Sequence, residues 1–323
     1  MSQGGGDRSG VQEDLMRLWR RLRPVEEAAL FRLGLALVPL LPRRSVVALA
    51  AAAGSLAYRC ARRDRRIALA NLDLAYGAGL APSEKVAIAR RSFITFALVL
   101  LDYFWFSRRT AERLRRHVRI DASLGRWLHA GPLMAVTAHF GNWEMLGLST
   151  ALQGTALASV ARPLRNQRID GHLQRFRQST GQRVVPREGA LKVLVNVLRE
   201  GGTVALLLDQ DTPLSEGGVF VDFFGVPVPV SGAAAALARR MGAPILPVFC
   251  KVQRGGDYLC YARAPIPVET LEQLSPEAIT GRIAALLEAE IRADPGQWLW
   301  MYKRWKRRHP GCDPARYPFY ADS

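Results

Sequence analysis

The chain has 323 residues, of which 49% are hydrophobic and 23% are charged, a composition typical of a globular protein with a large core. Its net charge of +17 indicates an anionic partner, which could be a membrane surface, a phosphorylated substrate, an acidic protein or nucleic acid. The basic residues gather in arginine-rich clusters beside apolar helices, and the sequence contains no nucleic-acid-binding signature, so we expect no nucleic acid among the partners. Four cysteines without a C-x-x-C pair and five histidines without H-E-x-x-H give no support for a metal site.

The N-terminal part combines a polar start with two apolar stretches. Residues 1–24 begin Gly-rich and polar without a secretory pattern, so we expect a disordered or short helical N-terminus. Residues 25–66 hold two apolar helical stretches, Ala28–Leu41 and Ser45–Tyr58, joined by a basic turn. Neither reaches the roughly 18 to 20 uninterrupted apolar residues of a simple membrane span. This favours a helical hairpin lying in the membrane interface, although a buried helix pair fits the same pattern.

Two more helices are predicted before the pattern changes. The first covers Ile67–Tyr76, and the second is expected to be capped by Ser83 and to include the aromatic-rich Arg90–Phe106. From about Val118, short apolar runs alternate with helices, which is typical of an α/β sheet.

We therefore predict an α/β domain over residues 67–310, followed by a tail at 311–323. The predicted strands are Val118–Ile120, Leu133–Ala138, Ala156–Ala161, Val184–Val185, Thr203–Leu208, and the pair Val248–Val252 and Tyr258–Ala262.

His139 lies at the exit of the strand predicted over Leu133–Ala138, and Asn142 begins the next helix. Glu144 falls in the first helical turn, where the bend at Phe140 and Gly141 would fold its carboxylate towards the imidazole. A carboxylate that accepts from one ring nitrogen fixes the tautomer and leaves the other nitrogen free to take a proton from an alcohol. Alternatively, His139 only ends the strand and Glu144 only complements the helix dipole.

The string H-F-G-N-W-E at residues 139–144 resembles the H-x4-D/E motif of the glycerolipid and lysophospholipid acyltransferase superfamily, in the form seen in the lipid A biosynthesis (lauroyl/myristoyl) acyltransferase family. Two further strings are similar to this branch, D-Q-D at 209–211 and G-V-F-V-D-F-F-G at 218–225. The F-P-E-G-T block of related glycerolipid enzymes is absent, which favours a glycolipid acceptor.

The resemblance implies an α/β fold with a central, mostly parallel sheet flanked by helices and an N-terminal membrane-associated helical hairpin. It implies transfer of a fatty acyl group from an acyl thioester to a hydroxyl of a phosphorylated glycolipid, as in late acylation of lipid A, with no cofactor. The expected donor is acyl-carrier protein, with acyl-CoA as the alternative. The other expected partners are the glycolipid acceptor and anionic lipids of the cytoplasmic face of a bacterial inner membrane.

Two rival functions remain at this point. One is an acyltransferase for another glycolipid or lysophospholipid, such as a phosphatidylinositol mannoside. The other is a non-catalytic membrane or nucleic-acid binding protein of the same fold.

Under the acyltransferase interpretation, His139 is the catalytic base and Glu144 its orienter. Arg162 follows the strand Ala156–Ala161, and its guanidinium suits a substrate phosphate. Asp209 and Asp211 flank an amide at the exit of the strand Thr203–Leu208, which could be a metal site, a loop cap or an acceptor-binding patch. The resemblance favours the patch, where the two carboxylates would contact sugar hydroxyls.

Three more residues are assigned to substrate binding, and the remaining arginines to the surface. Asn142 and Phe224 are expected to contact substrate, although Phe224 could instead be an ordinary core residue. Gly225 is expected to let backbone approach the thioester, and its N–H or those of the His139 turn would stabilise the oxyanion. Arg175 and Arg177 are expected on a solvated basic face.

The last predicted element is Gln297–Arg308. If this segment is helical, Trp298, Tyr302 and Trp305 share one face, with basic residues along the rest, a composition typical of an interfacial helix. The alternative is a solvated basic helix that docks through its tryptophans.

Overall fold

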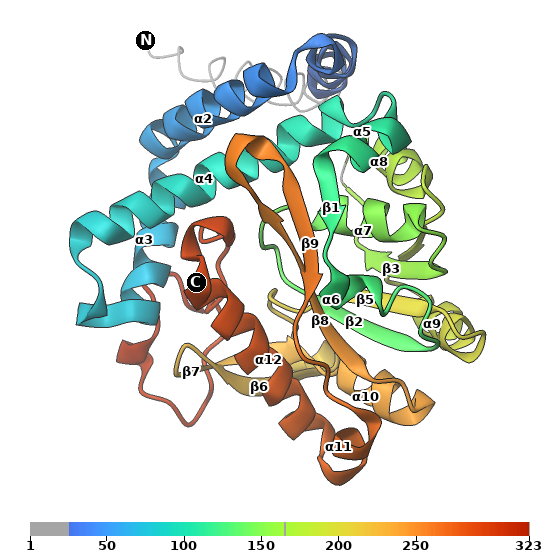
Figure 1. Ribbon diagram of the computed structural model, residues 1–323. Coiled ribbons are helices and arrows are strands. Elements are labelled where there is room, and N and C mark those ends of the chain that lie inside the picture. The colour runs from blue at the N-terminus through green and yellow to red at the C-terminus, as the bar shows by residue number, and fades with distance from the viewer. Residues whose placement is uncertain (1–25, 165, 323) are drawn as a thin grey trace, which may run out of the picture.

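The computed structural model describes residues 26–164 and 166–322, and a seven-stranded sheet with helices on both faces forms its centre (Figure 1). The strand order is β1-β9-β8-β2-β5-β3-β4, and every neighbouring pair is parallel except the antiparallel β8 and β9. This arrangement confirms the predicted mostly parallel sheet. The strands are β1 (Val118–Ile120), β2 (Leu133–Thr137), β3 (Leu157–Ala161), β4 (Arg183–Pro186), β5 (Thr203–Leu207), β8 (Ile245–Val252) and β9 (Tyr258–Ala262).

Most helices follow or connect these strands. The longest are α2 (Arg43–Cys60), α3 (Arg62–Tyr76), α4 (Pro82–Trp105) and α12 (Pro276–Ala293), and each covers a stretch that was predicted to be helical. The others are α5 (Thr110–His117), α6 (Ala122–Gly125), α7 (Trp143–Leu152), α8 (Gln167–Gln178), α9 (Ala190–Arg199), α10 (Ala233–Met241) and α11 (Val268–Gln273). Ser83 was expected to cap α4, but Pro82 begins that helix and Glu84 accepts from the backbone N–H of Ala81 at 2.7 Å. The proline at the first helical position fixes the start, because its missing N–H costs the helix nothing there.

The N-terminal helices pack along one side of the sheet domain. Residues 26–37 are helical, and α2 lies against α4 so closely that a Cβ built on Gly54 would be 2.5 Å from the Cα of Ile94. The predicted N-terminal segment 1–24 lies outside the described residues, and the boundary predicted at residue 66 falls inside α3. Among the described residues, no helix is long and apolar enough to cross a bilayer.

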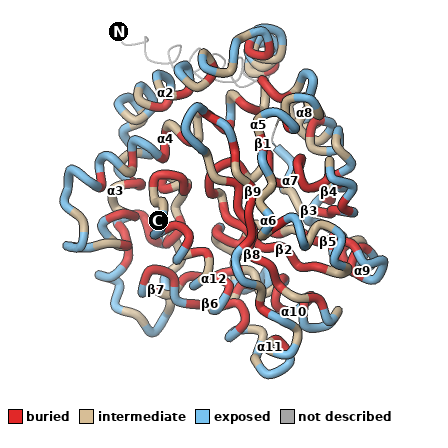
Figure 2. The backbone as a smooth tube through the Cα atoms, in the orientation of Figure 1, coloured by how far each residue is buried: buried red, intermediate tan, exposed pale blue. Residues whose placement is uncertain are grey.

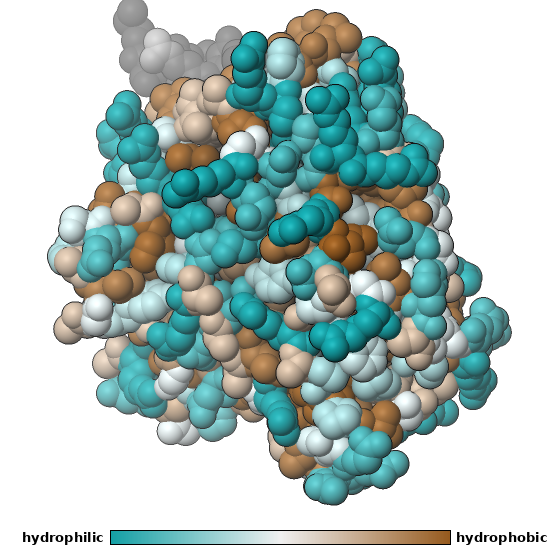
Figure 3. Space-filling view, in the orientation of Figure 1, coloured by the Kyte–Doolittle hydropathy of each residue, from teal (hydrophilic) through white to brown (hydrophobic). Residues whose placement is uncertain are grey.

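The core is divided between the two faces of the sheet. Figure 2 shows the central strands buried, while α2, α3 and α11 expose one side to solvent. Hydrophobic side chains reach the surface over residues 26–37, at the top of Figure 3. Within residues 26–60, the exposed leucines are Leu30, Leu33, Leu37, Leu40, Leu49 and Leu56.

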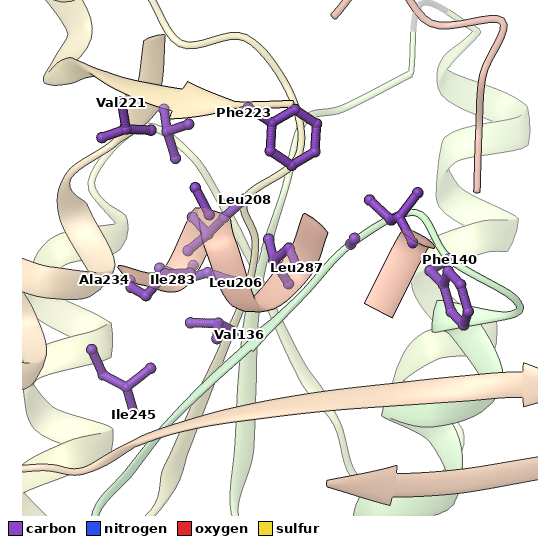
Figure 4. Close-up of a cluster of buried hydrophobic side chains, with 14 of the residues drawn as sticks. Val136, Phe140, Leu206, Leu208, Val221, Phe223, Ala234, Ile245, Ile283 and Leu287 are labelled. Atoms are coloured by element: carbon purple, nitrogen blue, oxygen red, sulfur yellow. The ribbon is translucent and has the colours of Figure 1, made fainter. Parts of the chain in front are cut away.

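One of the two core clusters joins the sheet to α12 and to a small hairpin. Figure 4 shows Val136 and Leu206 of the sheet beside Ile283 and Leu287 of α12, with Phe223 above them. The hairpin is antiparallel and consists of β6 (Gly218–Phe223) and β7 (Val226–Ser231). Its two-residue turn is formed by Phe224 and Gly225, with φ values of 53° and 72°.

The C-terminal segment is not the interfacial helix that its sequence suggested. After a short 3-10 turn at Pro295–Gln297 the chain continues without an α-helix through residues 298–308. Trp298, Trp300 and Trp305 are at most 1% exposed and pack around the phenylalanines of the β6–β7 turn. The tryptophans therefore stabilise the core. The expectation that Trp298 and Trp305 lie at headgroup depth is wrong.

Candidate active site

The register of two parallel strands brings His139 beside Asp209. Thr137, the last residue of β2, pairs with Leu207, the last residue of β5. His139 and Asp209 each lie two residues beyond these strand ends. Because both strands end at the same edge of the sheet, residues that follow them in equal number meet there. This edge also receives the end of β3, which leads to Arg162.

Asp209 is held by three donors. Its Oδ1 lies 2.8 Å from His139 Nδ1, and its Oδ2 accepts from the backbone N–H of His139 and from Trp298 Nε1, each at 2.8 Å. The residue is only 3% exposed, and this burial raises the pKa of the carboxyl. The attraction of His139 and the hydrogen bonds outweigh burial and leave the pKa of Asp209 below its usual range. Asp209 is therefore an anion that fixes the imidazole with Nδ1 as the donor.

The other ring nitrogen of His139 faces the open side of the site. Its Nε2 lies 3.3 Å from Gln210 Nε2, and Gln210 is exposed. The Trp143 ring meets the imidazole edge to face at 4.6 Å. The His139 side chain is 17% exposed, so Nε2 can be reached by a bound hydroxyl once the Gln210 amide moves aside.

Glu144 does not contact His139, contrary to the sequence-based expectation. Its carboxylate accepts a bidentate pair of hydrogen bonds from Arg177, with Nε at 2.8 Å from Oε2 and Nη2 bonded to Oε1. The two side chains are 14% and 17% exposed, so Arg177 is not part of a solvated basic face either. Burial lowers the pKa of Arg177, but the Glu144 carboxylate outweighs burial and raises it. The bend at Gly141 positions the carboxylate for α8, and Asp209 takes the place beside the imidazole.

Asn142 shapes the turn and is buried out of reach of the cavity described below. Its side chain accepts from Met145 N at 3.2 Å as the N-cap of α7, and donates to Asp102 and to Tyr258 Oη at 3.2 Å each. Asp102 also binds Arg43, the first residue of α2. Asn142 is 0% exposed and does not line the cavity, so the structure gives it a role in the turn instead of the expected place beside the substrate.

Phe224 and Gly225 are also placed away from the cavity. Phe224 is buried against Trp298, Trp300 and Trp305, and its backbone N–H donates to Glu288 at 2.5 Å. Gly225 accepts from Arg316 at 2.6 Å. The glycine serves the hairpin turn, where its positive φ is required, and it does not line the cavity beside His139, where it was expected to meet a thioester.

A cavity of about 850 Å³ opens beside His139. Its walls come from the ends of β2, β3 and β5, from α7 and α8, and from the C-terminal segment. The apolar part is lined by Leu124, Trp127, Leu133, Ala135, Leu146, Leu157, Ala205 and Val248. The charged part includes Glu144, Arg162, Arg177, Arg187, Asp211, Glu216, Lys306 and Arg307. Asp211 lines the cavity, but its side chain is fully buried and pairs with Lys306 and Arg307.

Three residues that sequence reasoning did not assign to the site contact it. Trp298 donates a hydrogen bond to Asp209, the Gln210 amide lies against His139 Nε2, and Arg177 donates to Glu144. Gln210 had a signal, since it lies between two carboxylates at a strand exit. Trp298 and Arg177 had none, because their positions depend on how distant segments pack. Across residues 26–164 and 166–322, no three His, Cys, Asp or Glu side chains gather in a way that could hold a metal ion.

Comparison with known proteins matches residues 18–307 to the family described as bacterial lipid A biosynthesis acyltransferase. A phosphatidylinositol mannoside acyltransferase of Mycobacterium tuberculosis is 30% identical over 61% of this chain and 62% of its own length. The chain thus aligns with less than two thirds of that relative. The lipid A biosynthesis palmitoleoyltransferase of Escherichia coli K12 is 26% identical over 80% of this chain and 84% of its own. The lauroyltransferase of the same organism is also 26% identical, over 87% and 91%.

Proposed function

Because the chain belongs to the bacterial lipid A biosynthesis acyltransferase family, we propose that it transfers a fatty acyl group from an acyl thioester to a hydroxyl of a phosphorylated glycolipid. The observation that carries the proposal is the His139 imidazole, fixed by an ionised Asp209, at the mouth of a partly apolar cavity. A base beside an apolar cavity suits the transfer of an acyl chain to an alcohol.

The proposed mechanism needs no nucleophilic side chain. Nε2 of His139 takes the proton of the acceptor hydroxyl, and the oxygen attacks the thioester carbonyl carbon. The tetrahedral intermediate then collapses. The C–S bond breaks and releases the thiolate, while the new C–O bond remains as the ester. The proton then passes from the imidazolium to the leaving thiolate, while Asp209 stabilises the cation without being protonated. His139 returns to its starting state.

The oxyanion needs donors that are not already bonded. The backbone N–H groups of His139, Gly141 and Asn142 donate to Asp209, Gln297 and Cys250 respectively. The N–H groups of Trp143 and Glu144, in the first turn of α7, have no acceptor within the described part of the chain. Both residues line the cavity, so we assign the oxyanion to these two donors in place of Gly225.

The apolar wall suits the acyl chain. Ala135 of β2 and Ala205 of β5 are paired small residues on the sheet face that lines the cavity, and Gly147 of α7 lies across from them. A Cβ on Gly147 would be 2.7 Å from Gln182 Oε1, so a larger residue here would have to displace the glutamine side chain that lines the cavity. Small residues on facing elements leave room for a methylene chain between helix and sheet.

Glu144 is proposed to act through Arg177. The bidentate pair keeps the guanidinium on the cavity wall and keeps the first turn of α7 in place. Loss of either partner would leave the other half-buried and unpaired. The resulting loss of stability is several times the free energy that a surface ion pair contributes. Glu144 is thus a positioning residue, and its loss is expected to impair transfer without a direct bond to His139.

Exposed basic and apolar side chains suit anionic partners and a membrane surface. Arg162 is exposed and lines the cavity, which suits a phosphate of the acceptor. The net charge of +17 suits both an anionic membrane face and an acidic acyl-carrier protein as donor. The exposed leucines of residues 26–40 support peripheral attachment to the cytoplasmic face of an inner membrane.

Acyl transfer in vitro tests the proposal. The full chain in detergent is given an acyl-carrier-protein or acyl-CoA thioester and a tetra-acylated lipid A precursor, and the product is detected by mass. Wild type should add one acyl group, and His139→Ala should not. Absence of transfer by folded wild type would refute this acceptor class.

A second acceptor class is favoured by the 30% identity to phosphatidylinositol mannoside acyltransferase. The chemistry at His139 would be unchanged, and only the glycolipid would differ. Offering both acceptors in the same reaction separates the two functions, since the acylated products differ in mass.

A further inference from the structure

The charged wall of the cavity is not evenly neutralised. Arg177 is paired with Glu144, and Arg187 with Glu216 at 2.5 Å. Arg162 forms no ion pair with any described residue, and one carboxylate, Asp211, serves two cations. Positive charge therefore remains at two places, beside Arg162 and beside the carboxylate of Asp211.

Asp211 holds two cations from the C-terminal segment. Its Oδ2 lies 3.0 Å from Arg307 Nε and 3.2 Å from Lys306 Nζ, and its backbone N–H donates to Tyr302 Oη at 3.2 Å. The Asp211 side chain is fully buried, whereas those of Lys306 and Arg307 are 39% and 43% exposed. The carboxylate is thus an anchor at the base of the pair, and the cationic ends reach the cavity.

The two cations keep unused donors. Within the described ranges, Arg307 bonds through Nε alone, which leaves both Nη groups, and Lys306 uses one of its three ammonium donors. Lys306 and Arg307 share the single carboxylate of Asp211, so one positive charge of the pair is left unbalanced by that carboxylate. The excess charge suits a phosphoryl group, which guanidinium and ammonium donors bind together.

We propose that Lys306 and Arg307, anchored by Asp211, form a second phosphoryl-binding subsite of the cavity, distinct from Arg162. The subsite rests on the proposed acyl transfer, because its ligand is a phosphate carried by one of the two substrates. The phosphate belongs either to the glycolipid acceptor or to the phosphopantetheine or nucleotide part of the thioester donor. Asp211 is accordingly a positioning residue for two cations.

The neighbouring Arg308 provides a matched control. It has the same side chain and follows Arg307 directly, but it pairs with Asp322 at 3.3 Å and does not line the cavity. We compare Arg307→Gln and Lys306→Gln with Arg308→Gln in the full chain, after confirming equal thermal unfolding. Arg307→Gln should lower kcat/KM about 10- to 100-fold, mainly through KM, the range for one hydrogen bond to a charged group. Arg308→Gln should stay close to wild type.

Trimmed substrates identify the source of the phosphate. One arm uses an acceptor whose phosphates have been removed, and the other uses an acyl-N-acetylcysteamine thioester, which has no phosphate. The defect of Arg307→Gln should vanish in the arm that lacks the bound phosphate and persist in the other. A defect that persists in both arms, or one that Arg308→Gln shares, would overturn the subsite.

Binding of inorganic pyrophosphate separates failure of the subsite from failure of the proposed reaction. Titration calorimetry with wild type should detect binding that Arg307→Gln weakens at least tenfold and Arg308→Gln leaves unchanged. If wild type transfers no acyl group but shows this pattern, the subsite stands and the reaction is wrong. Equal binding by the three proteins would refute the subsite whatever the outcome of the transfer assay.

Discussion

Asp209 receives its orientation from a tryptophan that lies 89 residues further along the chain. The Trp298 indole donates to the same oxygen that accepts from the His139 backbone, so the carboxylate cannot turn without losing two hydrogen bonds. The imidazole then keeps one tautomer and one direction. A fixed base is worth more than a mobile one because its hydrogen bond is formed before the substrate arrives.

Replacing Trp298 with Phe tests this arrangement. The ring stays, but the N–H donor to Asp209 is lost, so kcat/KM should fall about tenfold, as expected for one charge-assisted hydrogen bond. Trp300→Phe is the matched control, because its indole donates instead to Pro295 O at 2.7 Å. The two variants should lose similar stability, and only Trp298→Phe should lose activity. Equal kinetic constants would contradict the proposed role.

Gly141 gives the turn after His139 its shape. It has φ of 58°, and a Cβ built there would be 1.9 Å from the carbonyl oxygen of Cys250. Gly154 also has a positive φ, of 85°, but its nearest neighbour, a His129 ring carbon, is 3.9 Å away.

Alanine substitutions at Gly141 and Gly154 separate the effect of backbone strain, which both share, from the steric clash with β8, which only Gly141→Ala creates. Gly154→Ala should cost about 1 kcal/mol or somewhat more, the strain of the left-handed region alone. Gly141→Ala should lower the unfolding temperature much further and abolish transfer, because β8 must also move. Thermal unfolding followed by circular dichroism measures both. A Gly141→Ala variant as stable as Gly154→Ala would contradict the close approach of the turn to β8.

Among the elements, α2 and α4 are joined to the turn after His139 through one buried carboxylate. Asp102 is 0% exposed and binds Arg43 of α2, Tyr258 of β9 and Asn142 of the turn. Burial raises the pKa of Asp102 more than Arg43 and the hydrogen bonds lower it, so the ion pair is held against a desolvation cost. The ion pair therefore serves mainly to fix the positions of α2, β9 and the turn after His139 relative to one another.

Asp102→Ala should therefore destabilise the protein strongly. Removal leaves Arg43 buried and unpaired, for which about 3–5 kcal/mol is typical. Equilibrium unfolding in urea measures the loss, and Glu112→Ala, which breaks the exposed pair with Arg109, should change little. If the double variant Arg43→Ala with Asp102→Ala loses as much as the two single losses added, the two residues do not act together.

The elements also show how far the sequence alone could lead. The strands β1, β5 and β9 follow their apolar runs within a residue, because strand burial leaves a direct pattern. The β6–β7 hairpin was not predicted, since Pro227 and Pro229 interrupt β7 and prolines argue against a central strand. Those prolines are tolerated because β7 pairs with a single partner, β6.

The site was predictable in part. His139 and Asp209 were both recognised as strand exits, but their contact depends on β2 and β5 being neighbours, and order within a sheet is not visible in local patterns. Glu144 was assigned by its spacing from His139, whereas its partner Arg177 is determined by how α8 packs. The periodic tryptophans suggested a helical face, but they lie close together through tertiary packing around Phe223 and Phe224.

At the scale of the whole molecule, positive charge and exposed leucines together suit attachment to an anionic bilayer. Leu30, Leu33 and Leu37 are 69%, 53% and 53% exposed. Complete burial of a leucine side chain is favourable by about 1.5–3 kcal/mol. Partial insertion of three leucines into the bilayer therefore contributes more binding free energy than is lost when salt screens a few ion pairs.

A vesicle sedimentation assay tests this attachment. The triple variant of Leu30, Leu33 and Leu37 to serine should bind anionic vesicles at least tenfold less than wild type, and added salt should weaken both. Leu214→Ser, at a leucine that is 58% exposed on a different element, is the control and should bind like wild type. Unchanged binding by the triple variant would show that this surface does not contact the membrane.

Asp209, and not Glu144, is the carboxylate that orients the His139 imidazole. Nitrogen-15 NMR of histidine-labelled protein tests it directly, with the His139 signals assigned by their loss in His139→Ala. We predict a protonated Nδ1 whose signal shifts strongly in Asp209→Asn and stays nearly unchanged in Glu144→Gln. A Nδ1 signal that responds to Glu144→Gln and ignores Asp209→Asn would contradict the dyad.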